Sequence, residues 1–111
     1  MLRPTVLLAS SDPSLTDSVG SLIDAIHPLR LVVAATIGAA CNQVDREDVL
    51  LVVAHLDEGS CVTEVTRLLQ TIAIAGRSTV TLVVSDRYHA AQALALLRLG
   101  VADYLARPLN P

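Results

Sequence analysis

The sequence has 111 residues and a mass of 11.7 kDa, which is the size of one domain. Hydrophobic residues make up 52% and charged residues 17%, a composition that excludes a disordered chain and favours an aliphatic core. The net charge is −3 and the only aromatic residues are Tyr88 and Tyr104, so the basic patches and stacking rings of nucleic-acid-binding domains are missing.

The first third of the chain predicts a strand, a helix and a second strand. An apolar run at 5–9 predicts the strand. Asp12 can then cap a helix that has Pro13 at its first position and ends at His27 and Pro28. Its apolar residues recur at helical spacing: Leu15, Val19, Leu22, Ile23 and Ile26. A second strand is predicted at 31–35, followed by a short, weak helix at 36–47 that Gly38 interrupts.

The rest of the chain continues this alternation. Strands are predicted at 49–54 and 79–84, with a weaker one at 101–105. One helix is expected between the first two strands, closed by Gly76, and another after them, started by Ser85 or Asp86 and closed by Gly100. Their apolar positions are Val65, Leu68, Leu69 and Ile72 in the first, and Ala90, Ala93, Leu94 and Leu97 in the second.

Strand and helix alternate throughout, and the strands are continuously apolar. Right-handed crossovers turn this pattern into a single α/β domain, residues 1–111, with a doubly wound, five-stranded parallel sheet covered on both faces. Ligands of such sheets sit beyond the carboxyl ends of the strands. The residues expected to converge there are Ser10, Ser11, Asp12, Ala54, His55, Asp57, Ser85, Asp86, Ala106 and Arg107.

The cysteines and the N-terminal residues indicate the cellular compartment in which we expect the protein. Cys41 and Cys61 lack the spacing of a zinc site, so we expect two free thiols in a reducing cytosol. The apolar run 6–9 is too short for a signal-peptide core or a membrane span. We therefore expect a cytoplasmic protein with no membrane partner.

Several of these segments resemble the receiver domains of two-component response regulators, the CheY-like family. The stretch "LRLGVADYLARPLNP" is similar to the family's A-G-A-x-D-Y-L-x-K-P-[FL]-x-P, "TVTLVVSD" to its fourth strand with the Ser/Thr at Ser85, and "TVLLASSDP" to its first strand. The 22-residue step from Ser85 to Arg107 also matches the family. The resemblance implies a three-layer sandwich with strand order 2-1-3-4-5 and a cis peptide before Pro108. The family's fifth helix is missing from this chain, so we expect an N-terminal fragment of a longer regulator.

The chain departs from the family where the phosphorylation chemistry is expected. Ser10 and Ser11 stand in place of the two acidic residues that hold Mg²⁺ in the family, and Asp12 suits helix capping better. An alignment without gaps puts His55 at the position of the phospho-accepting Asp, and a shorter loop would put Val53 or Ala54 there. None of these three forms an acyl phosphate. Arg107 replaces the family's Lys, so a planar guanidinium group stands in place of a compact ammonium group.

These departures predict a domain that is not phosphorylated by the family's mechanism. We expect no metal site, no cofactor, and Mg²⁺ binding that is weak or absent. Asp57 stays open as an offset acceptor. His55 is either a hydrogen-bonded polar plug or, alternatively, a phosphohistidine or metal ligand. Arg107 either forms an ion pair with one of Asp12, Asp57 and Asp86, or it binds an anion.

The resemblance also implies a switch and a contact face. Ser85 and Tyr104 match the family's switch pair, which would lose its usual trigger without a phosphoryl group. We expect Tyr104 to be a fixed core or interface ring. The candidate partner face comprises Tyr88, Leu99, Val101 and Ala102, because "LALLRLGVA" is more apolar than one buried helix face requires.

The predicted function is that of an atypical receiver, a non-enzymatic regulatory and dimerisation module. We expect a homodimer, a contact with a downstream effector domain, or both, and no direct contact with nucleic acid. The resemblance favours a sigma-54-type transcription regulator, with the N-terminal receiver of a pilus-localisation ATPase as the alternative. A flavodoxin-like cofactor binder is disfavoured because "SSDPSLTD" lacks the glycines of a phosphate cradle.

Overall fold

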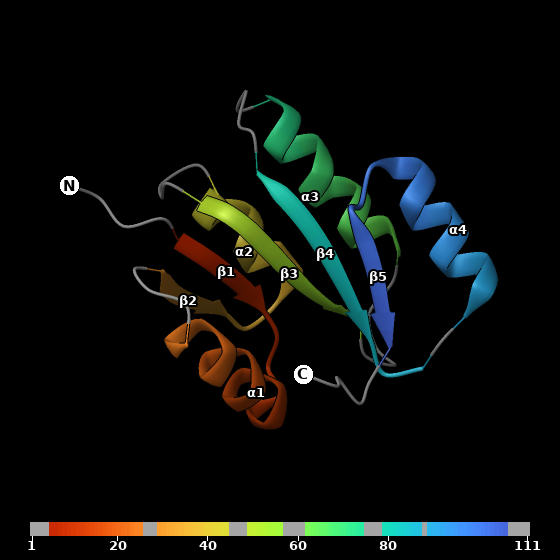
Figure 1. Cartoon of the computed structure of the whole chain (residues 1–111). Coiled ribbons are helices and arrows are strands. Elements are labelled where there is room, and N and C mark those ends of the chain that lie inside the picture. Colours follow the sequence, from red (N-terminus) through yellow and green to blue (C-terminus); the bar gives the residue numbers. More distant parts are fainter. Residues whose placement is uncertain are drawn as a thin grey trace.

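The computed structural model describes residues 5–25, 29–44, 49–56, 62–74, 79–87 and 89–106. Strands and helices alternate along these residues (Figure 1). The strands are β1 (Thr5–Ala9), β2 (Arg30–Ala34), β3 (Val49–Leu56), β4 (Val80–Ser85) and β5 (Asp103–Ala106). The helices are α1 (Pro13–Asp24), α2 (Ile37–Val44), α3 (Val62–Ile74) and α4 (Ala90–Leu99).

All five strands form one parallel sheet in the order β2-β1-β3-β4-β5. Helix α1 lies on one face of this sheet, and α2, α3 and α4 lie on the other (Figure 1). The predicted α/β doubly wound fold and its strand order are therefore confirmed. The strand order reverses at β1, between β2 and β3, and this switch point is where open parallel sheets place their sites.

The core has two parts, one on each face of the sheet. Leu7 of β1 belongs to the larger part, beside Leu68 of α3 and Leu96 of α4. Its neighbours Val6 and Leu8 belong to the smaller part, which α1 covers. Successive strand residues point to opposite faces, so a central strand needs apolar residues at every position. This explains the continuously apolar runs of the sequence.

The two faces are not equally covered. Among the described residues, α1 is the only helix on its face of the sheet, and it lies toward β1 and β2 (Figure 1). Val80 of β4 is 45% exposed and Leu105 of β5 is 36% exposed. Within the described ranges β5 is the last element, so the expectation of a missing fifth helix stays a prediction.

The helix ends follow the sequence signals in two places and depart from them in two. Helix α1 ends at Asp24, with Ala25 as its C-cap, before the predicted end at His27 and Pro28. Asp12 caps α1 by accepting from the Ser14 amide at 2.9 Å, with Pro13 as the first helical residue, as predicted. Gly100 closes α4 with a φ of 111°, a left-handed conformation that favours glycine. The predicted start of α4 at Ser85 or Asp86 is wrong, because His89 is the N-cap residue and its side chain makes no capping bond.

The strand bounds also shift in ways that matter for the site. Strand β3 runs two residues beyond the predicted 49–54, because His55 and Leu56 continue the pairing with Val84 and Ser85 of β4. Strand β5 begins at Asp103, since Val101 still belongs to the turn that closes α4. Within the described part of the chain, no helix has the length and apolar character needed to cross a bilayer.

Candidate functional site

The carboxyl ends of β1, β3 and β4 bring three predicted rim residues together. Ala9 lies beside Ala54 in the sheet, so the residues that follow them, Ser10 and His55, are also neighbours. His55 in turn lies beside Val84, two residues before Asp86. The parallel register therefore places His55, rather than Val53 or Ala54, opposite Ser10 at this edge.

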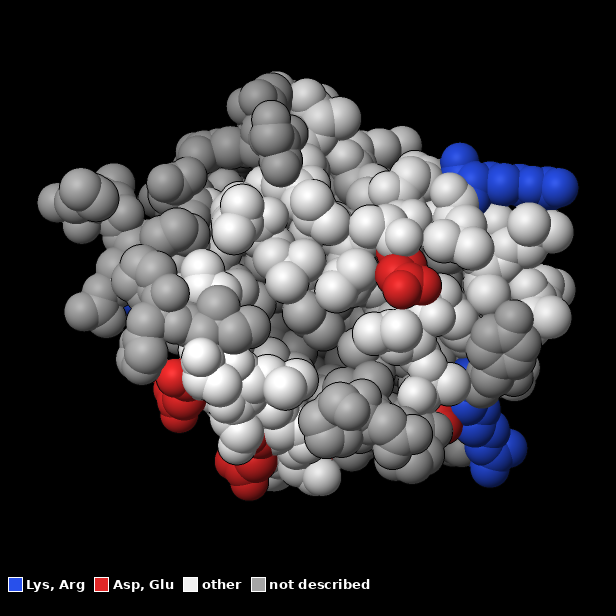
Figure 2. Space-filling view, viewed as in Figure 1, with Lys and Arg blue, Asp and Glu red and all other residues white. Residues whose placement is uncertain are grey.

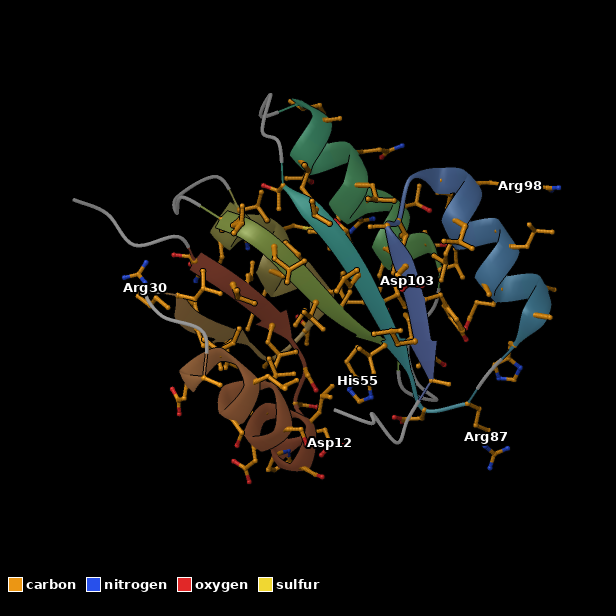
Figure 3. All side chains as sticks on the ribbon, in the orientation of Figure 1. Asp12, Arg30, His55, Arg87, Arg98 and Asp103 are labelled. Atoms are coloured by element: carbon orange, nitrogen blue, oxygen red, sulfur yellow. The ribbon has the colours of Figure 1, made fainter. Side chains whose placement is uncertain are left out.

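Both ring nitrogens of His55 are hydrogen-bonded. The Nδ1 atom is 2.8 Å from Ser10 Oγ, and the Nε2 atom is 2.8 Å from Asp86 Oδ1. The His55 side chain is only 3% exposed, whereas the Asp86 side chain is 36% exposed. In Figure 3 the ring lies at the lower edge of the sheet, between the ends of β1 and β4. This is the geometry of a hydrogen-bonded polar plug.

The partners of His55 fix the tautomer of its neutral ring. An ionised carboxylate only accepts hydrogen bonds, so Nε2 carries the hydrogen that Asp86 accepts. The neutral ring then has a lone pair on Nδ1, which accepts from the Ser10 hydroxyl. The Ser10 oxygen accepts from the Asp12 amide at 3.0 Å. We call this set of Ser10, His55, Asp86 and the Asp12 amide the His55 cluster.

The described carboxylates at this edge already have structural roles. Asp12 Oδ1 accepts from the Ser14 amide at the start of α1, and Asp86 Oδ1 holds His55. Ser11 is exposed. Among the residues that the structure describes, no group of three or more His, Cys, Asp or Glu side chains is arranged to hold a metal ion. Asp57, Arg107 and Pro108 lie outside the described residues, so what we predicted for them stays a prediction.

Ser10, His55 and Asp86 are also the residue types of a nucleophile, a base and an orienting carboxylate. In catalytic arrangements of this kind the nucleophile must reach a substrate. Ser10 is only 5% exposed, and its oxygen already accepts from the Asp12 amide. The arrangement therefore acts as a bond between strands and gives no support to an acyl-transfer site.

A second polar cluster surrounds Tyr104 at the start of α4. Ser85 Oγ donates to the carbonyl oxygen of Arg87 at 2.6 Å. The Tyr104 hydroxyl lies 3.1 Å from that same oxygen and 2.9 Å from Gln92 Oε1, and it accepts from the His89 amide at 3.4 Å. Tyr104 is 8% exposed. The Tyr104 cluster, meaning Ser85, Arg87, His89, Gln92 and Tyr104, thus ties the β4–α4 turn to β5.

Sequence reasoning singled out Ser85 and Tyr104 but missed their partners. Gln92 is the one polar side chain within "AAQALALL", a signal that could have marked it as a partner for a buried hydroxyl. Arg87 takes part through its backbone carbonyl, and the residue type at a position does not reveal such a contact in the sequence.

The predicted partner face needs one correction. Leu99 is 45% exposed and Ala102 is exposed, but Val101 is buried at 4%. Val101 faces the core because it follows the left-handed turn at Gly100, with its amide bonded to the Leu96 carbonyl. Tyr88 lies outside the described residues. Leu94 and Leu97 of α4, which are 50% and 46% exposed, extend the exposed apolar surface instead.

Comparison with known proteins bears on the fold. No family model matches the chain, and no curated protein is significantly similar to it in sequence. Solved structures do match. The signal receiver domain of a putative LuxO repressor protein from Vibrio parahaemolyticus has a TM-score of 0.79 at 23% identity, over 98% of this chain and 82% of that one. The chain has the fold of receiver domains.

Two further structures lead to the same conclusion. A CheY-like response regulator receiver domain from Methanospirillum hungatei has a TM-score of 0.76 at 20% identity, over 98% of this chain and 85% of that one. The orphan response regulator HP1043 of H. pylori has a TM-score of 0.79 at 19% identity, over 97% of this chain and 86% of that one. The predicted CheY-like architecture is confirmed.

Proposed function

We propose that this chain is a receiver-type domain of two-component signalling that regulates through protein contacts and accepts no phosphoryl group. The observation that carries the proposal is the His55 cluster. A buried histidine, hydrogen-bonded to Ser10 and Asp86, stands at the strand ends where a phospho-receiver would need an acidic pair and an acceptor carboxylate.

Phosphoryl transfer makes demands that the described rim does not meet. It needs a nucleophilic oxygen and cationic groups that neutralise the developing charge, because the protein contributes mainly positioning and electrostatics. Asp12 caps α1, and Asp86 holds His55. Ser10 supplies a hydroxyl where a Mg²⁺ ligand would be a carboxylate.

The Tyr104 cluster supports a domain with a fixed rather than a switched surface. The Ser85 hydroxyl donates to the Arg87 carbonyl, and Tyr104 is bonded to the same turn. Neither hydroxyl needs an external group to be satisfied, because each has a protein partner. The surface around α4 would then be presented without a phosphorylation signal.

We further propose that the exposed leucines of α4 form the contact surface for a second copy or for an effector domain. Leu94 and Leu97 lie three residues apart, on one side of α4, and both are about half exposed. Several exposed leucines on one helix are more than the scattered apolar residues of an ordinary surface. Leu99 and Ala102 continue this surface toward β5.

For the parent protein we propose a sigma-54-type transcription regulator, with a pilus-localisation ATPase as the alternative. Both proposals rest on the resemblance of the sequence to receiver domains. If the natural protein extends beyond this chain, its other domains separate the two proposals. An enhancer-binding ATPase followed by a helix-turn-helix supports the first, and an ATPase without a DNA-binding domain supports the second.

The first experiment is a titration with beryllofluoride and Mg²⁺, which together mimic an acyl phosphate, followed by the amide NMR signals of Ser85 and Tyr104. We expect no saturable shift at millimolar Mg²⁺. A saturable shift that is lost in Asp57→Asn would show an offset acceptor and overturn the proposal. A saturable shift that persists in Asp57→Asn would overturn it as well, since another group would then bind the anion.

The contact surface is tested by the oligomeric state of matched variants. Leu97 of α4 and Leu22 of α1 are both 46% exposed, so Leu97→Glu and Leu22→Glu make the same chemical change on different helices. If α4 is the self-association surface, sedimentation velocity shows loss of the dimer only for Leu97→Glu. Equal effects of the two variants, or a wild-type monomer at all concentrations, would rule out self-association through α4.

A further inference from the structure

We infer that the His55 cluster is a proton-dependent link between the β1–α1 turn and the β4–α4 turn. Its hydrogen bonds run without interruption from Asp86, through both ring nitrogens of His55, to Ser10 Oγ and the Asp12 amide. Residues that follow two other strands, β1 and β4, thus share the imidazole of β3. The inference does not depend on the proposed function, since it concerns the described hydrogen bonds alone.

The direction of each bond depends on the charge of the ring. In the neutral ring, Nδ1 accepts from the Ser10 hydroxyl, which leaves the Ser10 oxygen free to accept from the Asp12 amide. A second proton, taken from solvent, turns Nδ1 into a donor. Ser10 Oγ then accepts from both His55 and Asp12, and the Ser10 hydroxyl hydrogen must turn toward a new acceptor. Protonation therefore reverses one bond of the link and alters the next.

The burial of the cluster makes this reversal consequential. Ser10 is 5% exposed and the His55 side chain is 3% exposed, so bulk water does not readily replace a lost partner. A rotated Ser10 hydroxyl changes the hydrogen bond of the Asp12 amide, and Asp12 is the N-cap of α1. The proton on His55 thus reaches the start of α1 through one side chain.

Few other charged groups among the described residues face His55. Asp86 contacts the ring directly, and Asp12 directs its carboxylate to the Ser14 amide. Figure 3 shows Arg87 pointing away from the ring. The charged residues Asp57, Glu58 and Arg107, which follow β3 and β5 in the sequence, lie outside the described residues, so the experiment includes variants that neutralise them.

The test is a histidine-resolved NMR titration of the whole chain, carried downward in pH over the range in which the chain stays folded. At the upper end, we expect the ring nitrogen spectrum of His55 to show the tautomer with hydrogen on Nε2. As the pH falls, the amide signals of Asp12 and Asp86 should move with the same midpoint as the His55 ring. Asp57→Asn, Glu58→Gln and Arg107→Gln should keep this common midpoint, even where they displace it.

Two variants separate the link from a general effect of acid. In Ser10→Ala, His55 should still titrate and the Asp86 amide should still follow it, but the Asp12 amide should no longer do so. His89 is exposed and lies outside the His55 cluster, so His89→Gln should leave all three signals coupled. Far-UV circular dichroism checks that each variant is folded. If Ser10→Ala does not fold, Ser10→Cys provides the same test, because a thiol is a weaker donor.

Three results would overturn the inference. One is hydrogen on Nδ1 at the upper end of the titration, because the Ser10 hydroxyl could not then donate to it. Another is a wild-type Asp12 amide that stays still while His55 titrates. The third is an Asp12 amide that follows His55 equally in the wild type and in the folded Ser10 variant.

Discussion

The two polar clusters at the carboxyl edge of the sheet are built in different ways. The His55 cluster joins β1, β3 and the turn after β4 through side chains 45 and 31 residues apart in sequence. In the Tyr104 cluster, Ser85 and Tyr104 both reach one backbone carbonyl, that of Arg87, and the Tyr104 hydroxyl also contacts Gln92 and the His89 amide. In the first cluster one side chain joins all the partners, whereas in the second a backbone carbonyl and a hydroxyl share them.

This difference determines how each cluster should respond to mutation. Loss of a side-chain hub leaves two buried or half-buried polar partners without their bonds, which is costly. Loss of one donor to a shared carbonyl leaves the other donor in place. We therefore expect substitutions in the His55 cluster to cost more stability than substitutions in the Tyr104 cluster. In Figure 2, the charged side chains of the described residues are scattered over this face of the molecule and do not gather into one large patch.

The largest effect is expected from His55→Leu, which replaces the imidazole with an apolar side chain of similar bulk and so removes both hydrogen bonds. We expect the free energy of unfolding to fall by about 2–3 kcal/mol, because Ser10 and Asp86 each lose a partner. Urea unfolding measures this. The double variant Ser10→Ala/His55→Leu should lose less than the sum of the single variants. Additive losses would show that the two side chains are not coupled.

A smaller effect is expected from Tyr104→Phe, which keeps the buried ring and removes the hydroxyl. The loss should be about 1.5 kcal/mol, because the one hydroxyl hydrogen that the Gln92 and Arg87 oxygens share is removed and the His89 amide loses its acceptor. Denaturant unfolding gives the loss, and amide exchange at His89 should accelerate. A loss as large as that of His55→Leu would remove the contrast between the clusters.

Ser85→Ala tests the shared carbonyl directly and should cost about 1 kcal/mol, since Tyr104 still reaches the Arg87 oxygen. Combined with Tyr104→Phe, it should cost more than the sum of the two single losses, because only then does the carbonyl lose both donors. A double-mutant cycle in urea measures this coupling. A coupling of zero would mean that the two hydroxyls act independently.

The smallest effect, of opposite sign, is expected at Thr81 of β4. Its hydroxyl is buried and, unlike those of Ser10 and Ser85, has no hydrogen-bond partner among the residues that the structure describes. Thr81→Val should raise the free energy of unfolding by about 0.5 kcal/mol, because an unpaired buried hydroxyl is replaced by a methyl group. Thr79→Val is the matched control, because the Thr79 hydroxyl donates to the Val49 carbonyl at 2.8 Å. We expect Thr79→Val to lose stability. A gain in stability for both variants would instead indicate a general preference for Val over Thr in these strands.

Local signals in the sequence predicted much of the fold. The continuously apolar runs predicted a parallel sheet covered on both faces, and Asp12, Pro13 and Gly100 marked helix ends that the structure has. Each of these signals acts within a few residues, through backbone conformation or a capping bond. The start of α4 was missed because Asp86, a good capping residue by type, is engaged by His55 from another strand.

The sequence by itself thus determined the order and type of the elements and the residues that gather at the carboxyl edge, since periodicity and capping are local properties. Only the tertiary structure decided which of those residues touch. The register between β1 and β3 brings His55 beside Ser10, the turn after β4 brings Asp86 to the other ring nitrogen, and the turn at Gly100 buries Val101. Contacts between strand ends depend on sheet register and turn geometry, which no stretch of a few residues encodes.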